Sequence, residues 1–108
     1  MFKLPLIGGH ITKKLKDVRL LLESNKKELR EKFKIKQIGI FGSYVRGEQK
    51  KTSDVDIIVE FEKPVGLFEF IGLKNHLSDL LKVNVDLVMK KGLRPRIEGR
   101  ILKEVVYV

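Results

Sequence analysis

Residues 54–61, Asp-Val-Asp-Ile-Ile-Val-Glu-Phe, constrain the fold of this chain more than any other segment. Apolar residues recur at every second position from Val55 to Phe61, and this period of two indicates a β-strand. Because side chains alternate across a strand, Asp54 and Asp56 project from the same face. Two ionised carboxylates at this spacing repel each other strongly. A shared proton, a nearby Lys or Arg, water or a divalent cation must relieve that repulsion.

The flanking segments predict helices and two more strands around this one. The predicted elements are an amphipathic helix over residues 10–32, a strand ending at 38–41, a short helix after Gly42-Ser43, a helix over 67–81, a strand over 83–89 and a helix near Pro95. In the last helix, we expect a packing stripe formed by Ile97, Ile101, Leu102 and Val105. This order predicts an α/β (α+β) domain with a small sheet.

Length and charge restrict the function. A chain of 108 residues forms one domain and has no room for a separate substrate domain. Its net charge of +9 fits an anionic partner such as a nucleotide, a nucleic acid or an acidic protein surface. A lysine-rich surface that only contacts water explains the same charge. The absence of cysteine excludes disulfides, thiolate zinc sites and cysteine nucleophiles.

The N-terminal segment predicts no membrane span. Its apolar residues are interrupted at Lys3, Pro5 and Gly8-Gly9, well short of the roughly 18 residues that a span requires. We therefore expect a cytoplasmic protein without membrane contact.

Two further features suggest a site beside the aspartate pair. Glycine at position 42 lets the backbone approach a ligand closely, and the amides that begin the next helix suit a phosphate. Ser43 adds a hydroxyl donor, although it also suits a simple helix cap. Asp86 is a lone carboxylate in an apolar strand, which is unusual unless the residue is paired, binds metal or lies at an exposed edge. Together these features predict one site for metal and phosphate.

The combined pattern resembles the DNA polymerase beta-like nucleotidyltransferase superfamily. The segments GSYVRGE, SDVDIIVEF, VDLV and LRPRIEGRILKEVVYV are most similar to minimal nucleotidyltransferases, which are stand-alone domains of about this length. The resemblance implies a small mixed β-sheet flanked by helices. It also implies a single domain over residues 1–108 with a core motif region at 37–89.

The resemblance implies a role for each motif residue. Asp54, Asp56 and Asp86 become catalytic metal ligands for two Mg²⁺ ions, with Mn²⁺ as a substitute, and Gly42 and Ser43 hold the phosphates of ATP. Arg46 lies one helical turn after Ser43, where it reaches either the triphosphate or a structural carboxylate. The basic residues Lys50, Lys51, Lys90, Lys91, Arg94 and Arg96 line the site or face solvent.

The resemblance also implies a partner. Minimal nucleotidyltransferases occur as antitoxins beside HEPN-domain RNases and transfer AMP from ATP to a tyrosine of the toxin. We therefore expect a magnesium-dependent protein adenylyltransferase that needs no nucleic acid. One alternative is an antitoxin that neutralises by complex formation alone. Another is nucleotidyl transfer to a small molecule or to RNA, although few aromatic residues are present to stack on RNA bases.

Overall fold

In the computed structural model, which describes residues 13–108, four strands form one mixed sheet. In spatial order they are β3 (Val85–Met89), β2 (Val55–Phe61), β1 (Ile35–Phe41) and β4 (Val106–Tyr107). β1 pairs antiparallel with both β2 and β4, whereas β2 and β3 are parallel. The predicted fold class, a small mixed sheet flanked by helices, is therefore confirmed.

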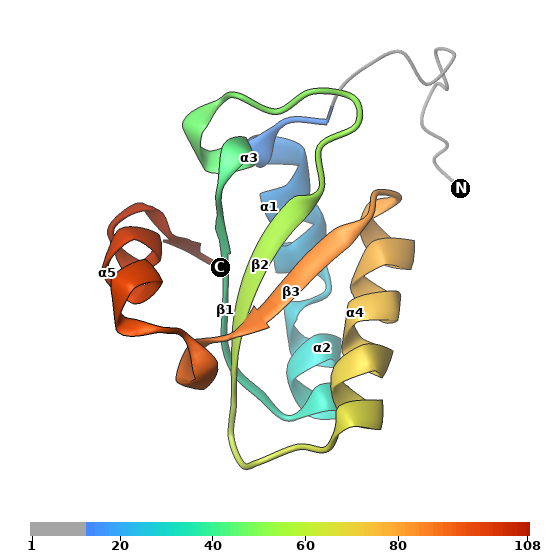
Figure 1. The fold of residues 1–108 in the computed structure, drawn as a ribbon. Helices are drawn as coiled ribbons and strands as arrows, with labels where there is room; N and C mark the ends of the chain where they lie inside the picture. The colour runs from blue at the N-terminus through green and yellow to red at the C-terminus, as the bar shows by residue number, and fades with distance from the viewer. Residues whose placement is uncertain (1–12) are drawn as a thin grey trace, which may run out of the picture.

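The helices lie on both sides of β1 (Figure 1). They are α1 (Leu15–Ser24), α2 (Lys26–Phe33), α3 (Ser43–Arg46), α4 (Leu67–Leu81) and α5 (Pro95–Glu104), with a 3₁₀ turn η1 (Lys90–Gly92) before α5. The first two helices and α4 pack on the sheet, whereas α5 stands on the other side of β1. The short α3 directly follows β1 and leads into the loop before β2.

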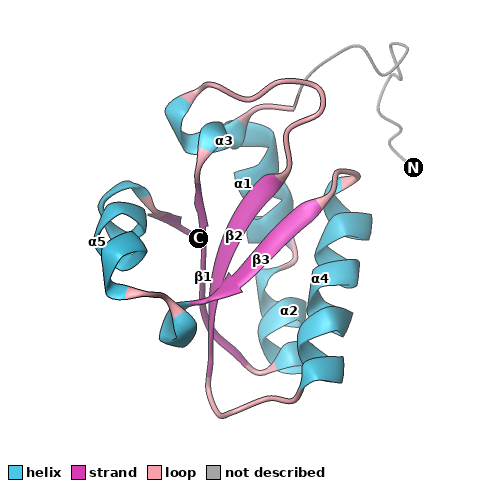
Figure 2. Cartoon of the chain, viewed as in Figure 1, coloured by secondary structure: helices cyan, strands magenta, loops and turns pink. Residues whose placement is uncertain are grey.

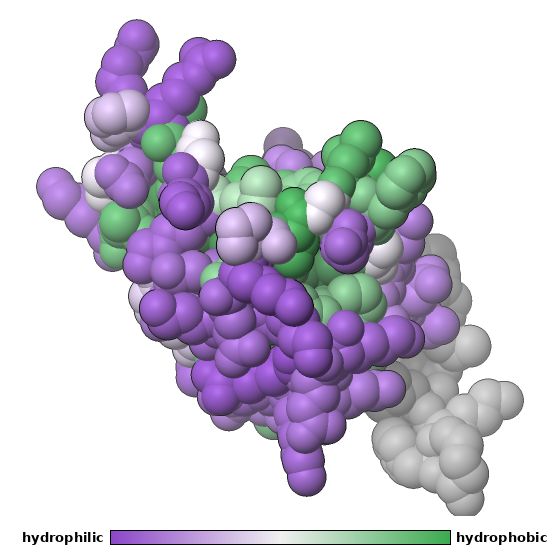
Figure 3. Space-filling view, turned by 90° about the horizontal axis from the view of Figure 1, so that it is seen from below, coloured by the Kyte–Doolittle hydropathy of each residue, from purple (hydrophilic) through white to green (hydrophobic). Residues whose placement is uncertain are grey.

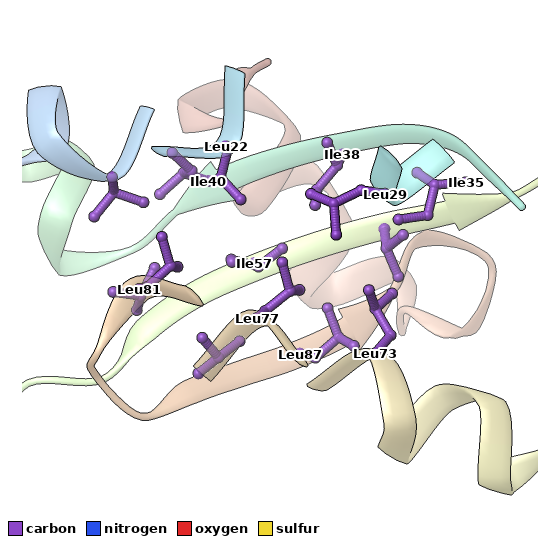
Figure 4. Packing of buried hydrophobic residues seen from close by; sticks show 14 of the residues in the cluster. Leu22, Leu29, Ile35, Ile38, Ile40, Ile57, Leu73, Leu77, Leu81 and Leu87 are labelled. Atoms are coloured by element: carbon purple, nitrogen blue, oxygen red, sulfur yellow. The ribbon is translucent and has the colours of Figure 1, made fainter. Parts of the chain in front are cut away.

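One apolar cluster joins α1, α2 and α4 to the sheet (Figure 4). Helix residues such as Leu22, Leu29 and Leu77 meet strand residues such as Ile40 and Ile57, and all five are almost fully buried. Alternate residues of β2 contribute to this cluster, so the period of two in the sequence identified the buried face. Asp54 and Asp56 consequently face away from it.

The predicted helix over residues 10–32 is wrong as a single element. Residues 10–12 lie outside the described residues, and the remainder divides at Asn25 into α1 and α2. The side chain of Ser24 donates to the carbonyl of Leu20, and that of Asn25 donates to the carbonyl of Leu21, both at 2.8 Å. Ser and Asn side chains compete with backbone amides for helical carbonyls, which favours a break here. The carbonyl of Asn25 then accepts the Leu29 amide and starts α2.

The predicted packing stripe of the C-terminal helix is wrong at two of its four residues, Ile97 and Leu102. Ile101 is buried, but Ile97 and Leu102 are 42% and 36% exposed. Val105 leaves the helix in an extended conformation and leads into β4, which was not predicted. Its side chain lies over Gly39 of β1, where an added Cβ would be 2.6 Å from a Val105 methyl group. The last residues therefore pack as a strand. The third strand is also shorter than predicted, because β3 begins at Val85.

The end of the molecule opposite α3 is mainly polar, with apolar side chains grouped within it (Figure 3). Leu67 and Phe68, which begin α4 there, are 69% and 88% exposed. Within residues 13–108, no helix has the length and apolar character needed to cross a membrane.

Candidate active site

The Gly-Ser turn connects β1 to α3 through a backbone conformation that favours glycine. Gly42 has φ 81° and ψ −151°, a region that is essentially restricted to glycine. Its carbonyl accepts the amides of Val45 and Arg46 at 3.0 and 3.2 Å, so Gly42 is the N-cap of α3. A Cβ atom added at Gly42 would collide with Oδ2 of Asp56. The predicted turn and the predicted aspartate pair therefore lie in direct proximity.

The sheet register brings the third aspartate to the second. Asp56 in β2 lies opposite Asp86 in the parallel strand β3, and opposite Phe41 in β1. Asp54 lies two residues before Asp56, just before β2 begins. Figure 2 shows the loop from α3 passing over this end of the sheet before it enters β2. All three aspartates therefore lie at one end of the sheet, beside the Gly-Ser turn.

The surroundings of Asp56 raise the pKa of its carboxyl group. Burial, followed by the negative charges of Asp86 and Asp54, raises the pKa of Asp56 from 3.8 to about 6. The positive charge of Arg46 opposes this rise in pKa. Asp56 is half-buried, whereas Asp54 and Asp86 are exposed. Three neighbouring carboxylates, with Arg46 as the positive charge that acts on Asp56, favour the binding of a cation.

The donor set fits a hard divalent cation that also binds phosphate. Mg²⁺ prefers oxygen ligands and usually takes only one or two protein carboxylates, with phosphate oxygens and water completing the octahedron. Among residues 13–108, no three His, Cys, Asp or Glu side chains form a group that could hold a metal ion by themselves. A metal bound here would therefore depend on ligands from the nucleotide or from water in addition to the aspartates.

Arg46 forms the structural ion pair, one of the two roles expected from its position. Its Nε donates to Glu48 at 2.9 Å, and its Nη1 donates to both carboxylate oxygens of Glu104 at 3.1 and 3.2 Å. The hydrogen bonds to Glu48 and Glu104 raise the pKa of Arg46 above its already high ordinary value. A contact between Arg46 and phosphate stays a prediction.

Sequence reasoning missed Glu104. Its Oε2 accepts the backbone amide of Gly42 at 2.7 Å, so this amide already has an anionic partner. The two residues are 62 positions apart, and no spacing rule relates them. The only signal was that Glu104 lies within the C-terminal segment that resembles the minimal nucleotidyltransferases.

The basic segment after β3 lies away from the three aspartates. Asp86 is near the start of β3, and Lys90, the first residue after its other end, lies about 13 Å further along at the usual rise per residue. Lys90 there approaches Glu60 of β2 at 3.9 Å. Lys50 and Lys51 lie in the loop before β2 and are exposed. For the segment from Lys90 to Arg96, this position favours a solvated basic surface over a wall of the site.

Comparisons with known proteins agree with this geometry. A family model described as "Nucleotidyltransferase domain" matches residues 22–108. The Protein adenylyltransferase MntA of Thermococcus cleftensis is 52% identical over 94 residues, which cover 87% of this chain and 95% of that protein.

Solved structures share the fold. One, assigned as a minimal nucleotidyltransferase, superposes with a TM-score of 0.74 at 34% identity and covers 87% of this chain and 95% of its own. Another, a crystal structure of a toxin-antitoxin with AMP-PNP, has a TM-score of 0.63 at 25% identity and covers 85% of this chain and 69% of the matched chain. The likeness therefore extends over most of the described fold.

Proposed function

This chain belongs to the nucleotidyltransferase domain family, and we propose that it transfers AMP from ATP to a hydroxyl group of a partner protein. The observation that carries the proposal is the meeting of Asp54, Asp56 and Asp86 with the Gly42-Ser43 turn at one end of the sheet. Carboxylates can hold the cation that activates a hydroxyl and stabilises charge on phosphate, and a glycine lets the backbone approach the phosphate closely. The name of the Thermococcus relative, a protein adenylyltransferase, supports the choice of acceptor class.

The positions of the three aspartates suggest a different role for Asp86 than for Asp54 and Asp56. Asp54 and Asp56 would hold two Mg²⁺ ions, and Asp86, next to Asp56 in the sheet, would complete the ligand set and orient the acceptor hydroxyl. Bound Mg²⁺ supplies charge stabilisation for the triphosphate and activation of the attacking hydroxyl. The Gly-Ser turn lies close to Asp56 and would place the phosphates within reach of the three carboxylates. A bond forms between the acceptor oxygen and the α-phosphorus, pyrophosphate leaves, and the hydroxyl proton is released.

The proposed acceptor is a tyrosine of a HEPN-family RNase toxin, so this chain would act as an antitoxin in the cytoplasm. The resemblance of the motifs to minimal nucleotidyltransferases supports this partner. The toxin-antitoxin structure with AMP-PNP, which contains a chain of this fold, supports a toxin partner and the use of an adenine nucleotide.

The test of the proposal is a covalent transfer. Mixed with its proposed toxin partner, ATP and Mg²⁺, this protein should increase the mass of the partner by one or more adenylate units while its own mass stays unchanged. The modified partner should stay inactive after this protein is removed, because a phosphodiester is covalent. Intact-mass spectrometry and an RNase assay measure both effects. Inhibition without a mass change, lost on dissociation, would instead indicate an antitoxin that acts by binding alone.

ATP binding should require a divalent cation. Without one, a triphosphate adds negative charge to three carboxylates, and the pKa of Asp56 is already raised by burial and by its acidic neighbours. We expect calorimetry to give an affinity at least about 100-fold weaker in EDTA than with Mg²⁺ or Mn²⁺, since a metal contributes several kcal/mol to binding such charge. Equal affinities in EDTA and in Mg²⁺ would remove the metal from the proposal.

A further inference from the structure

The carboxylate of Glu104 bridges the two ends of α3. Its Oε2 accepts the amide of Gly42, the N-cap, at 2.7 Å. Both of its oxygens also accept Nη1 of Arg46, the last residue of α3, at 3.1 and 3.2 Å. Hydrogen bonds to an ionised carboxylate are about twice as strong as neutral ones. One side chain from the far end of the sequence therefore fixes the entire Gly-Ser turn.

The turn needs such support because α3 is too short to be stable alone. It has four residues, and its N-cap is a glycine, which has no side chain to cap the first amides of the helix. Nucleating a helical turn is unfavourable, and one turn gains too few hydrogen bonds to compensate. The Gly42 amide donates to Glu104, and Gly42 is buried. Without Glu104 this amide would be left unpaired away from water, which is unfavourable.

Glu104 is itself anchored to the strand that carries the turn. It ends α5, and the residues after it form β4, which pairs Tyr107 with Gly39 and Val106 with Ile40 of β1. The amide of Val108 donates to the carbonyl of Ile38 at 3.0 Å. The Glu104 side chain is only 21% exposed. Its carboxylate is therefore held in register with the end of β1, where Gly42 follows.

We propose that Glu104 is a positioning residue for nucleotide binding: by holding the Gly42 amide and Arg46 together, it keeps the Gly-Ser turn in the shape that receives the triphosphate. Glu104 acts through the turn and does not contact ATP. The C-terminal segment from Glu104 to Val108 is then part of the nucleotide site. The role in ATP binding rests on the proposed function, whereas the support of the turn does not.

The test compares three variants by their affinity for ATP with Mg²⁺. Glu104→Ala removes both contacts, and we expect roughly 10- to 100-fold weaker binding, the usual effect of losing a hydrogen bond to a charged group. Glu104→Gln keeps an oxygen for the Gly42 amide but loses the charge, so its loss should be smaller. Glu48→Gln is the matched control, because Glu48 pairs with Arg46 at 2.9 Å without touching Gly42. This control should bind ATP like wild type.

A second measurement needs no nucleotide. We expect NMR hydrogen exchange at the Gly42 amide to be slow in wild type and much faster in Glu104→Ala, while the amides of β2 stay protected in both. If wild type binds no ATP but shows this exchange pattern, the proposed function fails and the support of the turn stands. Unchanged exchange at Gly42 in Glu104→Ala would overturn the inference. So would wild-type or tighter ATP binding by that variant. If the alanine variant does not fold, Glu104→Gln replaces it, and wild-type ATP affinity together with wild-type exchange at Gly42 in Glu104→Gln would overturn the inference.

Discussion

The Asp54→Asn/Asp56→Asn double variant should lose AMP transfer by about 1000-fold or more and still fold. Asparagine preserves the size of each side chain but removes the charges that would hold a cation, and a bound metal contributes several kcal/mol of charge stabilisation. The assay is AMP incorporation into the partner protein. Asp79→Asn is the control, because Asp79 is an exposed aspartate on α4 and is not one of the three aspartates of the proposed site. It should transfer AMP at the wild-type rate.

The single substitution Asp56→Asn should stabilise the metal-free protein. Because the pKa of Asp56 rises from 3.8 to about 6, the folded state binds this proton more tightly than the unfolded state. The stabilisation from the protonated carboxyl is complete below pH 3.8 and is lost as the pH rises through about 6. Asp56→Asn should therefore raise the free energy of unfolding at pH 7 by about 1–2 kcal/mol, after allowance for the half-exposed side chain. The difference should disappear near pH 4.

Two results would contradict the site. Near wild-type transfer by the double variant would remove the aspartates from catalysis. A melting temperature many degrees lower in the double variant would show that the two aspartates stabilise the fold. Full neutralisation of the toxin in cells by a double variant that transfers no AMP would show that neutralisation works by complex formation alone.

Gly42→Ala should abolish ATP binding and strongly destabilise the domain. The φ of 81° and ψ of −151° suit only glycine, and an alanine held in this conformation is strained by roughly 1–3 kcal/mol. Its methyl group would also collide with Oδ2 of Asp56. Relief of the collision must displace either the turn or the carboxylate, and the proposed site needs both. Thermal unfolding and calorimetry with ATP and Mg²⁺ measure the two effects.

Gly47→Ala is the matched control for this substitution. Gly47 also has a positive φ, 72°, but its ψ of 21° is the left-handed helical conformation, and an added Cβ would meet no atom within 4 Å. Alanine there should cost about 1 kcal/mol and leave ATP affinity unchanged. Equal losses of affinity in the two variants would show that backbone strain, and not contact with Asp56, explains the effect of Gly42→Ala.

Local chemistry in the sequence determined the strand that carries the aspartates and the turn that precedes them. The alternation from Val55 onward identified the buried face of β2, and so placed Asp54 and Asp56 together on the other face. The bounds of α4, Leu67–Leu81, match the predicted helix. These features depend on residues close together in the chain, so their physical causes can be read along it.

Contacts between distant segments decided the rest. Asp86 lies beside Asp56 because β3 adds to the sheet parallel to β2 in that register, and strand pairing depends on the packing of the whole sheet. Glu104 reaches Gly42 because β4 pairs with β1, across 62 positions of sequence. The exposure of Ile97 and Leu102 likewise depends on how little of α5 the sheet covers. Periodicity shows which face of an element is apolar, but only the folded chain determines what that face meets.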